Sequence, residues 1–183
     1  MKIAVLALQG AFVEHERMLA RLGVETVEIR QLRGLEQPFS GLVLPGGEST
    51  VMMRLLDDLQ LREPLENRIR EGLPVFGTCA GLILLDRSHL GTMDMLARRN
   101  AYGRQLGSFR TLGTVAGVGD DVPMTFIRAP YIEETGPEVT VLAVHGGRTV
   151  AARQGRQLVS AFHPELDGDT RLHRCFLSLC REQ

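Results

Sequence analysis

The segment PVFGTCAGLILL, residues 74–85, decides the fold because it joins a buried strand to a helix through a glycine-flanked cysteine. Pro74–Gly77 contains a short apolar run typical of a strand, and Ala80–Leu85 has the composition of a buried helix. Glycines stand two residues on either side of Cys79, in the pattern G-x-C-x-G. They allow strand and helix to pass closely, because a Cβ there would clash. The pattern is the cysteine counterpart of the G-x-S-x-G nucleophile elbow.

Cys79 is therefore the candidate nucleophile. A side chain on such a turn projects from the carboxyl edge of the sheet, and the N-terminus of the following helix favours a thiolate there. A buried structural cysteine beside a glycine turn is the alternative, and it would be favoured for a cysteine taken alone. Cys175 and Cys180 fall in the last predicted helix without such a turn, and we interpret both as packing residues.

The chain before this segment alternates strands with helices. Continuous apolar runs predict strands that are covered on both faces, and apolar residues at helical spacing follow them. Ser49 or Thr50 can cap the second helix. The alternation predicts a parallel, doubly wound sheet. We expect strands at Ile3–Leu8, Val24–Ile29 and Leu42–Leu44, and helical segments at 11–22, 51–56 and 64–69.

The chain after the segment has a different pattern. Short β-like runs are separated by Gly, Pro and Asp, and we expect some of them to add antiparallel strands at the sheet edge. A closing helix follows, and no linker or internal repeat interrupts the chain, so residues 1–183 predict one α/β domain with a mixed sheet between two helical layers. The β-like runs are Arg110–Val118, Met124–Ile127, Val139–Val144, Thr149–Arg153 and Leu158–Phe162, and the helix carries the stripe Leu172, Phe176 and Leu179.

Composition excludes several classes of protein. With 21 Lys and Arg against 22 Asp and Glu, the chain has no basic excess for binding nucleic acid. No run approaches the roughly 20 apolar residues that cross a bilayer, and the apolar start is too short for a secretion signal. Three cysteines form neither a disulfide framework nor a paired zinc spacing. We expect a cytoplasmic protein without a metal site.

A histidine and a glutamate near the carboxyl end can complete the site. Among five histidines, only His163 directly follows a predicted strand and stands two residues before a carboxylate, Glu165. Residues two apart in an extended segment point the same way, so Glu165 could accept a hydrogen bond from His163 and fix its tautomer. A cysteine nucleophile needs such a base and orienting group. The alternative for the segment His-Pro-Glu is a surface loop.

The other histidines have no assigned catalytic role. His15 lies on the inner stripe of the first predicted helix, where we expect a core or boundary histidine. We expect His173 to face solvent. His89 and His145 lie in polar turns.

A second glycine loop, LPGGEST at residues 44–50, follows the third predicted strand. It lacks the G-K-[ST] of a phosphate-binding P-loop. Instead, the loop could present a backbone N–H to the oxyanion of a tetrahedral intermediate, with Gly47 as one donor and Ala80, next to Cys79, as the other. A simple Gly-Gly turn is the alternative.

Together, these segments resemble the class I, or triad, glutamine amidotransferases, which have a glycine-rich oxyanion strand, then G-x-C-x-G, then H-x-E. Over essentially the whole chain, the sequence is similar to the glutaminase subunits of pyridoxal 5′-phosphate synthase. The R-N-x-x-G-R-Q and FIRAP stretches are the most specific to that family. The matching stretches are LALQGA at 6–11, EH at 14–15, LPGGEST at 44–50, GTCAGL at 77–82, RNAYGRQ at 99–105, FIRAP at 126–130 and FHPEL at 162–166.

The resemblance implies a flavodoxin-like fold and a glutaminase that hydrolyses L-glutamine to glutamate and ammonia. It implies a triad of Cys79, His163 and Glu165, with Gly47 and Ala80 as the oxyanion hole. An α-carboxylate needs charge-assisted partners, which fits the two arginines among the implied binding residues. Glutamine binding is assigned to Gly47, Glu48, Ser49, Arg99, Ile127 and Arg128.

The resemblance also implies a partner and the absence of a cofactor. The ammonia would pass to the pyridoxal 5′-phosphate synthase subunit, a TIM barrel, within a hetero-oligomer. The glutaminase would be weak alone, and the partner would arrange the Gly46–Gly47 backbone. No metal or cofactor is needed for this chemistry.

Three other functions stay open. The same chemistry could serve another pathway, such as histidine biosynthesis. A cysteine peptidase or deglycase-like hydrolase could share the fold, although those usually place the nucleophile after an acidic residue and lack H-x-E. A non-catalytic adaptor could keep the fold alone, but it would need none of Cys79, His163 and Glu165.

Overall fold

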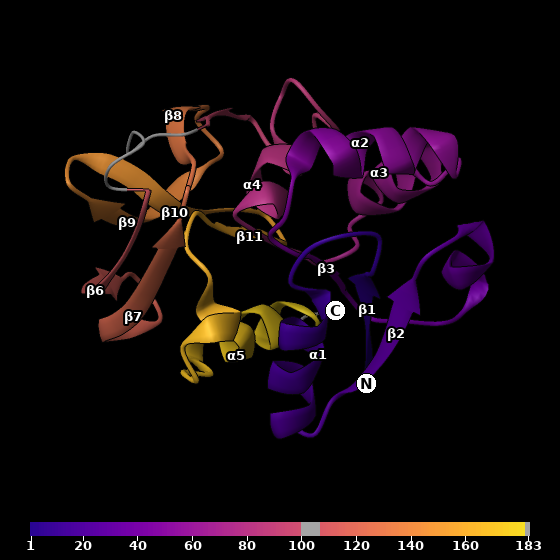
Figure 1. Ribbon diagram of the computed structural model, residues 1–183, viewed down its shortest axis with the longest axis horizontal. Helices are drawn as coiled ribbons and strands as arrows, with labels where there is room; N and C mark the ends of the chain where they lie inside the picture. Colours follow the sequence, from indigo (N-terminus) through magenta and orange to yellow (C-terminus); the bar gives the residue numbers. More distant parts are fainter. Residues whose placement is uncertain (100–106, 182–183) are drawn as a thin grey trace.

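A mixed sheet of nine strands runs through residues 1–99 and 107–181, which the computed structural model describes. The strand order is β2-β1-β3-β4-β11-β10-β8-β5, and β9 pairs with β10 beside this path. Most of the R-N-x-x-G-R-Q stretch, at 100–105, lies outside the described residues. Helices cover both faces of the sheet, which confirms the predicted three-layer α/β architecture (Figure 1).

The five strands from β2 to β11 form the parallel half of the sheet. Their apolar side chains are buried on both faces, which explains the continuous apolar runs in the sequence. Because the strands are parallel, their carboxyl ends meet at one edge. These strands are β1 (Lys2–Leu6), β2 (Glu25–Ile29), β3 (Leu42–Leu44), β4 (Val75–Thr78) and β11 (Gln157–Ser160).

The remaining strands are antiparallel, as we expected of some of the runs in the second half. Two of them, β5 (Met95–Arg98) and β8 (Tyr131–Thr135), were not predicted. Both are short, and exposed charged side chains interrupt their apolar pattern. The others are β9 (Thr140–His145) and β10 (Arg148–Gln154) in the large sheet, and β6 (Ser108–Val115) and β7 (Gly119–Ile127) in a separate two-stranded sheet.

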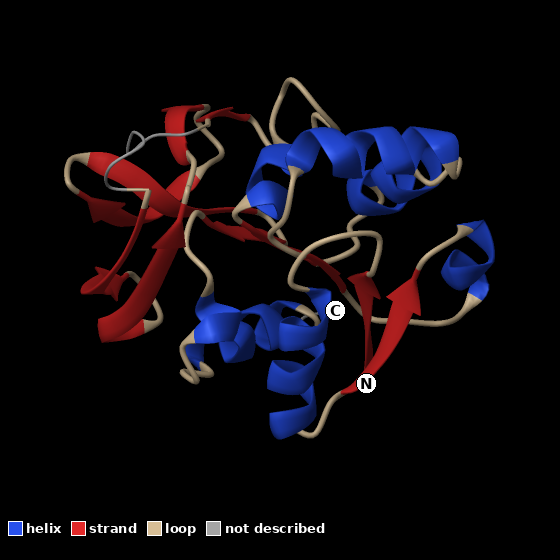
Figure 2. Cartoon of the chain, in the orientation of Figure 1, coloured by secondary structure: helices blue, strands red, loops and turns tan. Residues whose placement is uncertain are grey.

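Two groups of helices enclose the parallel half (Figure 2). On one face lie α1 (Phe12–Arg21) and α5 (Arg171–Leu179), and the short 3-10 helix η2 (Pro164–Leu166) contacts α1. All six residues of α4 are buried, as the composition of residues 80–85 predicts. On the other face lie α2 (Ser49–Asp58), α3 (Arg62–Arg70) and α4 (Ala80–Leu85), and the 3-10 helix η1 (Leu32–Glu36) follows β2.

Three local predictions are wrong, and the first concerns His145, which is the last residue of β9 and does not lie in a turn. Helix α2 already begins at Ser49, with Glu48 at the N-cap position and no side-chain cap, and the Thr50 hydroxyl instead accepts a hydrogen bond from Arg99. His173 is fully buried rather than solvent-facing. The buried face of α5 is wider than the predicted stripe, since residues 176 and 177 are also buried and stand three and four positions from 173.

Across the described ranges 1–99 and 107–181, no helix has the length and apolar character needed to cross a membrane.

Candidate active site

The predicted triad and the glycine loop follow three neighbouring strands of the parallel half. The loop with Gly46 and Gly47 follows β3, Cys79 follows β4, and His163 lies three residues after β11. Since β3, β4 and β11 are adjacent in the sheet, these segments meet at its carboxyl edge. Ligands of open α/β sheets bind at this edge.

Cys79 occupies a strained turn between β4 and α4. Its φ of 48° and ψ of −101° are unusual for a residue with a Cβ, and its N–H donates to the carbonyl of Ser160 at 2.8 Å. A Cβ on Gly81 would lie 1.9 Å from the Leu44 carbonyl oxygen, and one on Gly77 would lie 2.7 Å from the Gly81 oxygen. The two glycines are therefore required by close backbone packing, as the elbow interpretation predicts.

His163 joins Cys79 to Glu165. Its Nδ1–H donates to Glu165 Oε1 at 2.6 Å, and Cys79 is close enough to its ring to raise its pKa. The carboxylate of Glu165 is fully buried. A Cβ on Gly46 would lie 2.3 Å from the Cε1 of His163 and 3.4 Å from the Cβ of Cys79, so the glycine loop closes over both groups. The structure thus brings together three side chains that the sequence separates by 84 and 2 positions.

The electrostatics of this group favour a charged imidazole. Burial lowers the pKa of His163, but its interactions with Cys79 and Glu165 outweigh burial and raise the pKa to about 10. Burial raises the pKa of Glu165, but the neighbouring His15 and His163 outweigh it and lower the pKa overall. Glu165 is therefore a carboxylate and His163 carries a proton at neutral pH.

The glycine loop is held by the segment that follows β1. The N–H of Glu48 donates to the side-chain oxygen of Gln9 at 2.7 Å, and the N–H of Ala11 donates to the carbonyl of Gly46 at 2.9 Å. A Cβ on Gly47 would lie 2.3 Å from the same Gln9 oxygen. The sequence analysis gave Gln9 no role, although its position three residues beyond β1 indicates the same edge of the sheet.

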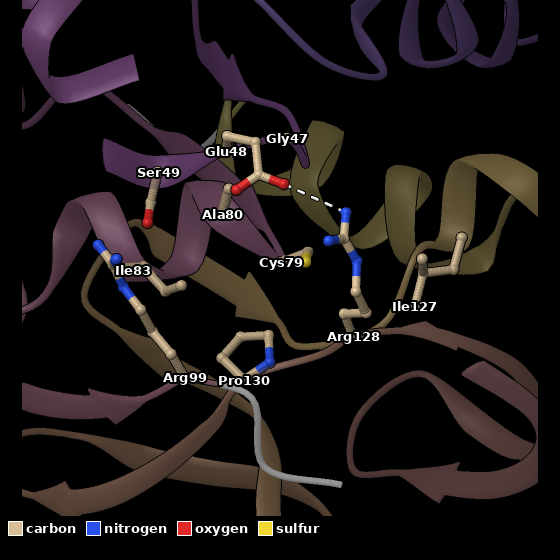
Figure 3. A pocket seen from close by; sticks show the side chains of 10 residues that line it. All are labelled: Gly47, Glu48, Ser49, Cys79, Ala80, Ile83, Arg99, Ile127, Arg128 and Pro130. Carbon is tan, nitrogen blue, oxygen red and sulfur yellow. Dashed lines mark hydrogen bonds and ion pairs between the residues drawn. The ribbon is translucent and has the colours of Figure 1, made fainter. Parts of the chain in front are cut away.

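One pocket contains Cys79 and every residue predicted to bind glutamine or an oxyanion (Figure 3). In this view, Arg99 and Arg128 lie on either side of Cys79. Within the described residues, no group of three His, Cys, Asp or Glu side chains could hold a metal ion. The lining residues are Gly47, Glu48, Ser49, Cys79, Ala80, Ile83, Arg99, Ile127, Arg128 and Pro130, of which Ile83 and Pro130 were not predicted.

Charged side chains at the pocket face each other or polar neighbours. Arg128 pairs with Glu48 at 3.2 Å, and their side chains are 72% and 59% exposed. Arg128 also has a positive φ of 44°. Arg99 donates to the Thr50 hydroxyl at 2.9 Å and approaches Nε2 of His89 at 3.5 Å. The pocket therefore offers one carboxylate and two guanidinium groups around the thiol.

Comparison with known proteins agrees with this geometry. A model described as the SNO glutamine amidotransferase family matches residues 5–182. The chain is 54% identical, over 193 aligned residues covering all of both proteins, to the pyridoxal 5′-phosphate synthase subunit PdxT of Streptococcus pneumoniae serotype 2 strain D39. The crystal structure of a glutamine amidotransferase is 43% identical, with a TM-score of 0.91 over 98% of each chain.

A more distant structure shares the fold alone. The crystal structure of a glutamine amidotransferase from Thermotoga maritima is 14% identical, with a TM-score of 0.68 over 100% of this chain and 84% of that one.

The fold and the edge at which these residues meet define a class I glutamine amidotransferase. Within that class, the chain belongs to the SNO glutamine amidotransferase family.

Proposed function

We propose that this chain is the glutaminase subunit of a pyridoxal 5′-phosphate synthase and that it hydrolyses L-glutamine to L-glutamate and ammonia through Cys79, His163 and Glu165. The observation that carries the proposal is the His163 ring, which hydrogen-bonds Glu165 and lies near Cys79, a residue that lines a charged pocket. The full-length similarity to a subunit named for that synthase supports the pathway.

Binding would use the opposite charges at the pocket. The α-carboxylate of glutamine is complementary to Arg99 and Arg128, and the α-ammonium is complementary to Glu48. Glu48 and Arg128 are paired with each other in this structure. Glutamine would exchange that ion pair for two new ones, and the side-chain amide would reach Cys79 between Gly47 and Ile127.

The first half of the reaction releases ammonia. The Cys79 sulfur, as thiolate, attacks the carboxamide carbon, and the negative charge moves to the carbonyl oxygen. Backbone N–H groups of Gly47 and Ala80 stabilise that oxyanion, an interaction of about 3 kcal/mol for one donor. His163 carries a proton at neutral pH, and it gives this proton to the departing nitrogen. The C–N bond breaks, and a γ-glutamyl thioester remains on Cys79.

The second half restores the enzyme. His163, now neutral, takes a proton from water as the water oxygen attacks the thioester carbon. The C–S bond breaks, glutamate leaves, and the thiolate returns beside a protonated imidazole. Glu165 holds the ring in the tautomer with a proton on Nδ1 throughout. No step requires a metal or an organic cofactor.

The ammonia would pass to the synthase subunit, a TIM barrel, inside a hetero-oligomer. Direct transfer has a chemical reason, because free ammonia in neutral water is mostly protonated and no longer nucleophilic. We expect weak activity without the partner, which would arrange the Gly46–Gly47 backbone. Gln9 and Ala11 hydrogen-bond to this loop, so a partner that moved them would also move the loop.

Three free thiols agree with a cytoplasmic location.

Labelling with a glutamine-mimicking diazoketone tests the proposal. In the presence of the synthase subunit, the reagent should modify Cys79 alone, as mapped by mass spectrometry, and glutamine should protect it. Cys180 is an internal control, because burial raises the pKa of its thiol to about 12. A label on Cys180 or Cys175 instead would contradict the assignment.

Activity assays separate the pathways. Glutamine hydrolysis should rise when the pyridoxal 5′-phosphate synthase subunit is added. The nitrogen of the released ammonia should then be found in the product of the synthase subunit. Equal turnover with and without the subunit would refute the coupling. Transfer to a histidine-biosynthesis synthase instead would support the rival pathway.

A further inference from the structure

A chain of buried polar side chains extends from the triad into the core. On the side of Glu165 away from His163, Nε2 of His15 lies 3.4 Å from Oε2 of Glu165 and 3.0 Å from the hydroxyl of Thr78. Nδ1 of His15 lies 3.0 Å from Nε2 of His173. His15, Thr78 and His173 are completely buried. The mechanism proposed above uses none of these three residues.

Helices α1 and α5 supply the two histidines, and β4 encloses them. The ring of Phe76, on β4, meets the ring of His15 edge-on at 6.0 Å and that of His173 edge-on at 5.4 Å. Rotation of either imidazole would displace this packed ring. The histidines are therefore fixed in orientation, and their hydrogen-bonding atoms have fixed targets.

The contacts determine which nitrogen of His15 carries the proton. Burial lowers the pKa of both histidines, so both rings are neutral and one of the two facing nitrogens must donate. If Nδ1–H of His15 donated, its Nε2 lone pair would face the Glu165 carboxylate at 3.4 Å. His173 would then carry its proton on Nδ1, which has no partner among the described residues, leaving a buried N–H unpaired.

The opposite arrangement satisfies more groups. When Nε2–H of His173 donates to Nδ1 of His15, the Nε2–H of His15 points at Thr78 and Glu165. Nδ1 of His173 then lacks only a donor, and a buried acceptor without a donor costs less than a buried N–H without an acceptor. Oε2 of Glu165 has no hydrogen-bond partner among the described residues, so the N–H of His15 is a polar neighbour of this oxygen at 3.4 Å, while His163 hydrogen-bonds Oε1.

We propose that His15 is a positioning residue of the active site. Its Nε2–H donates to the hydroxyl of Thr78, the residue before Cys79, and lies 3.4 Å from Oε2 of Glu165. It thereby fixes the loop that carries the base relative to the turn that carries the nucleophile, and His173 sets the tautomer of His15. The inference rests on the proposed triad, because His15 acts through Glu165 and touches no substrate.

Two substitutions of His15 separate the roles of its nitrogens. The amide nitrogen of glutamine can occupy the position of Nε2, whereas that of asparagine reaches only the position of Nδ1. With the synthase subunit present, His15→Asn should lower kcat for glutamine roughly 10- to 100-fold, the cost of a slightly misplaced catalytic group. His15→Gln should stay within about 3-fold of wild type, because it restores the donor. KM should change little in both.

Met18→Ala is the matched packing control, because Met18 is buried on the same helix and lies outside the polar chain. It should lower the Tm without lowering kcat. If Met18→Ala reduces kcat as much as His15→Asn at a similar Tm, or if the Asn and Gln variants lose activity equally, His15 is a structural residue and the inference is wrong.

A measurement on the wild-type chain is independent of whether the variants fold. Nitrogen-15 NMR of labelled histidine should show the proton of both His15 and His173 on Nε2. A proton on Nδ1 of His15 would overturn the proposal. A second readout is the pH profile of Cys79 alkylation, which we expect to differ between His15→Asn and wild type. Neither this profile nor the tautomer measurement requires glutaminase activity. Retained hydrolysis by Cys79→Ala would remove the proposed function, whereas unaltered Cys79 alkylation in His15→Asn would remove only the positioning role.

Discussion

The parallel and antiparallel halves of the sheet contribute different parts of the pocket. The parallel half places Cys79, His163 and Glu165 at the ends of β4 and β11, where their side chains are almost entirely buried. The antiparallel strands place Arg99 after β5 of the large sheet and Arg128 after β7 of the two-stranded sheet, and the Arg128 side chain is 72% exposed. The proposed reacting groups are thus fixed by packing, while the two arginines proposed to bind substrate are exposed and contact Glu48, Thr50 and His89.

The two sets of residues therefore differ in how much rearrangement substrate binding requires of them. Groups fixed by a core need no rearrangement when substrate arrives, which is how preorganised sites stabilise a transition state. Exposed charges are screened by water, so the Glu48–Arg128 pair contributes little to stability and can open readily. Substitutions in the parallel half should therefore affect kcat or folding, and those in the antiparallel half should affect KM.

The strongest test of the parallel half is Cys79→Ala. We expect glutamine hydrolysis with the synthase subunit to fall at least about 10⁴-fold, as for other enzymes that lose their nucleophile. The far-ultraviolet circular dichroism and the binding of the synthase subunit should stay as in wild type. Loss of structure would instead assign Cys79 a packing role.

One glycine substitution in each half compares how tightly the backbone is packed there, measured by the free energy of unfolding. Gly81→Ala places a Cβ 1.9 Å from the Leu44 carbonyl oxygen, which is backbone and cannot move aside. We expect the free energy of unfolding to fall by about 3 kcal/mol. Gly147, in the turn between β9 and β10, has a φ of 75° with open space around it. Gly147→Ala should cost about 1 kcal/mol. Equal losses in urea unfolding would contradict the difference in packing.

Arg128→Ala tests the antiparallel half. Removing one charge-assisted partner of the α-carboxylate should raise KM for glutamine roughly 10- to 100-fold, with a smaller change in kcat. Arg54→Ala is the control, because Arg54 is an exposed arginine of α2 outside the pocket and should leave both constants unchanged. An unchanged KM in Arg128→Ala would remove this residue from the binding site.

The smallest effect concerns acid stability. The pKa values of His15 and His173 are lowered by burial, so the unfolded chain binds more protons than the folded one below about pH 6.5. Stability should fall by about 1 kcal/mol per histidine between pH 7 and pH 5.5. The raised pKa of His163 acts in the opposite direction: the folded chain keeps this proton up to about pH 10, whereas the unfolded chain gains it only near pH 6.5, so acidification offsets part of the loss.

His173→Gln should remove about 1 kcal/mol of this acid loss, since glutamine does not titrate. Urea unfolding at the two pH values measures it. An acid slope identical to that of wild type would show that His173 is not a neutral buried group.

The two halves also differ in how much of their structure could be predicted from the sequence. Continuous apolar runs and glycine turns predicted the parallel strands, the elbow and the position of His163, because those patterns arise from local packing. Strands β5 and β8 were missed, since Glu133 and Glu134 are exposed on β8 and disrupt any apolar alternation. The pairing of Glu48 with Arg128 has no local signature either, because the two residues stand 80 positions apart.

The buried histidines show the same limit inside the core. His15 was expected in the core or at its boundary and lies there, but its contacts with His173 and Glu165 join elements from opposite ends of the chain. His173 was wrongly expected in solvent because a polar residue beside an apolar stripe usually faces outward. Only the fold shows that its partner is another histidine.

The Glu48–Arg128 ion pair has a consequence for which amides the enzyme can reach. Free glutamine is a zwitterion, so its α-ammonium and α-carboxylate could pair with Glu48 and Arg128 at the same time. Opening the ion pair would then leave neither side chain without an opposite charge. A glutamine residue within a polypeptide has neither terminal charge, so it would form neither of the ion pairs proposed for free glutamine. In the proposed binding mode, Glu48 and Arg128 would therefore favour the free amino acid over a glutamine side chain of another protein.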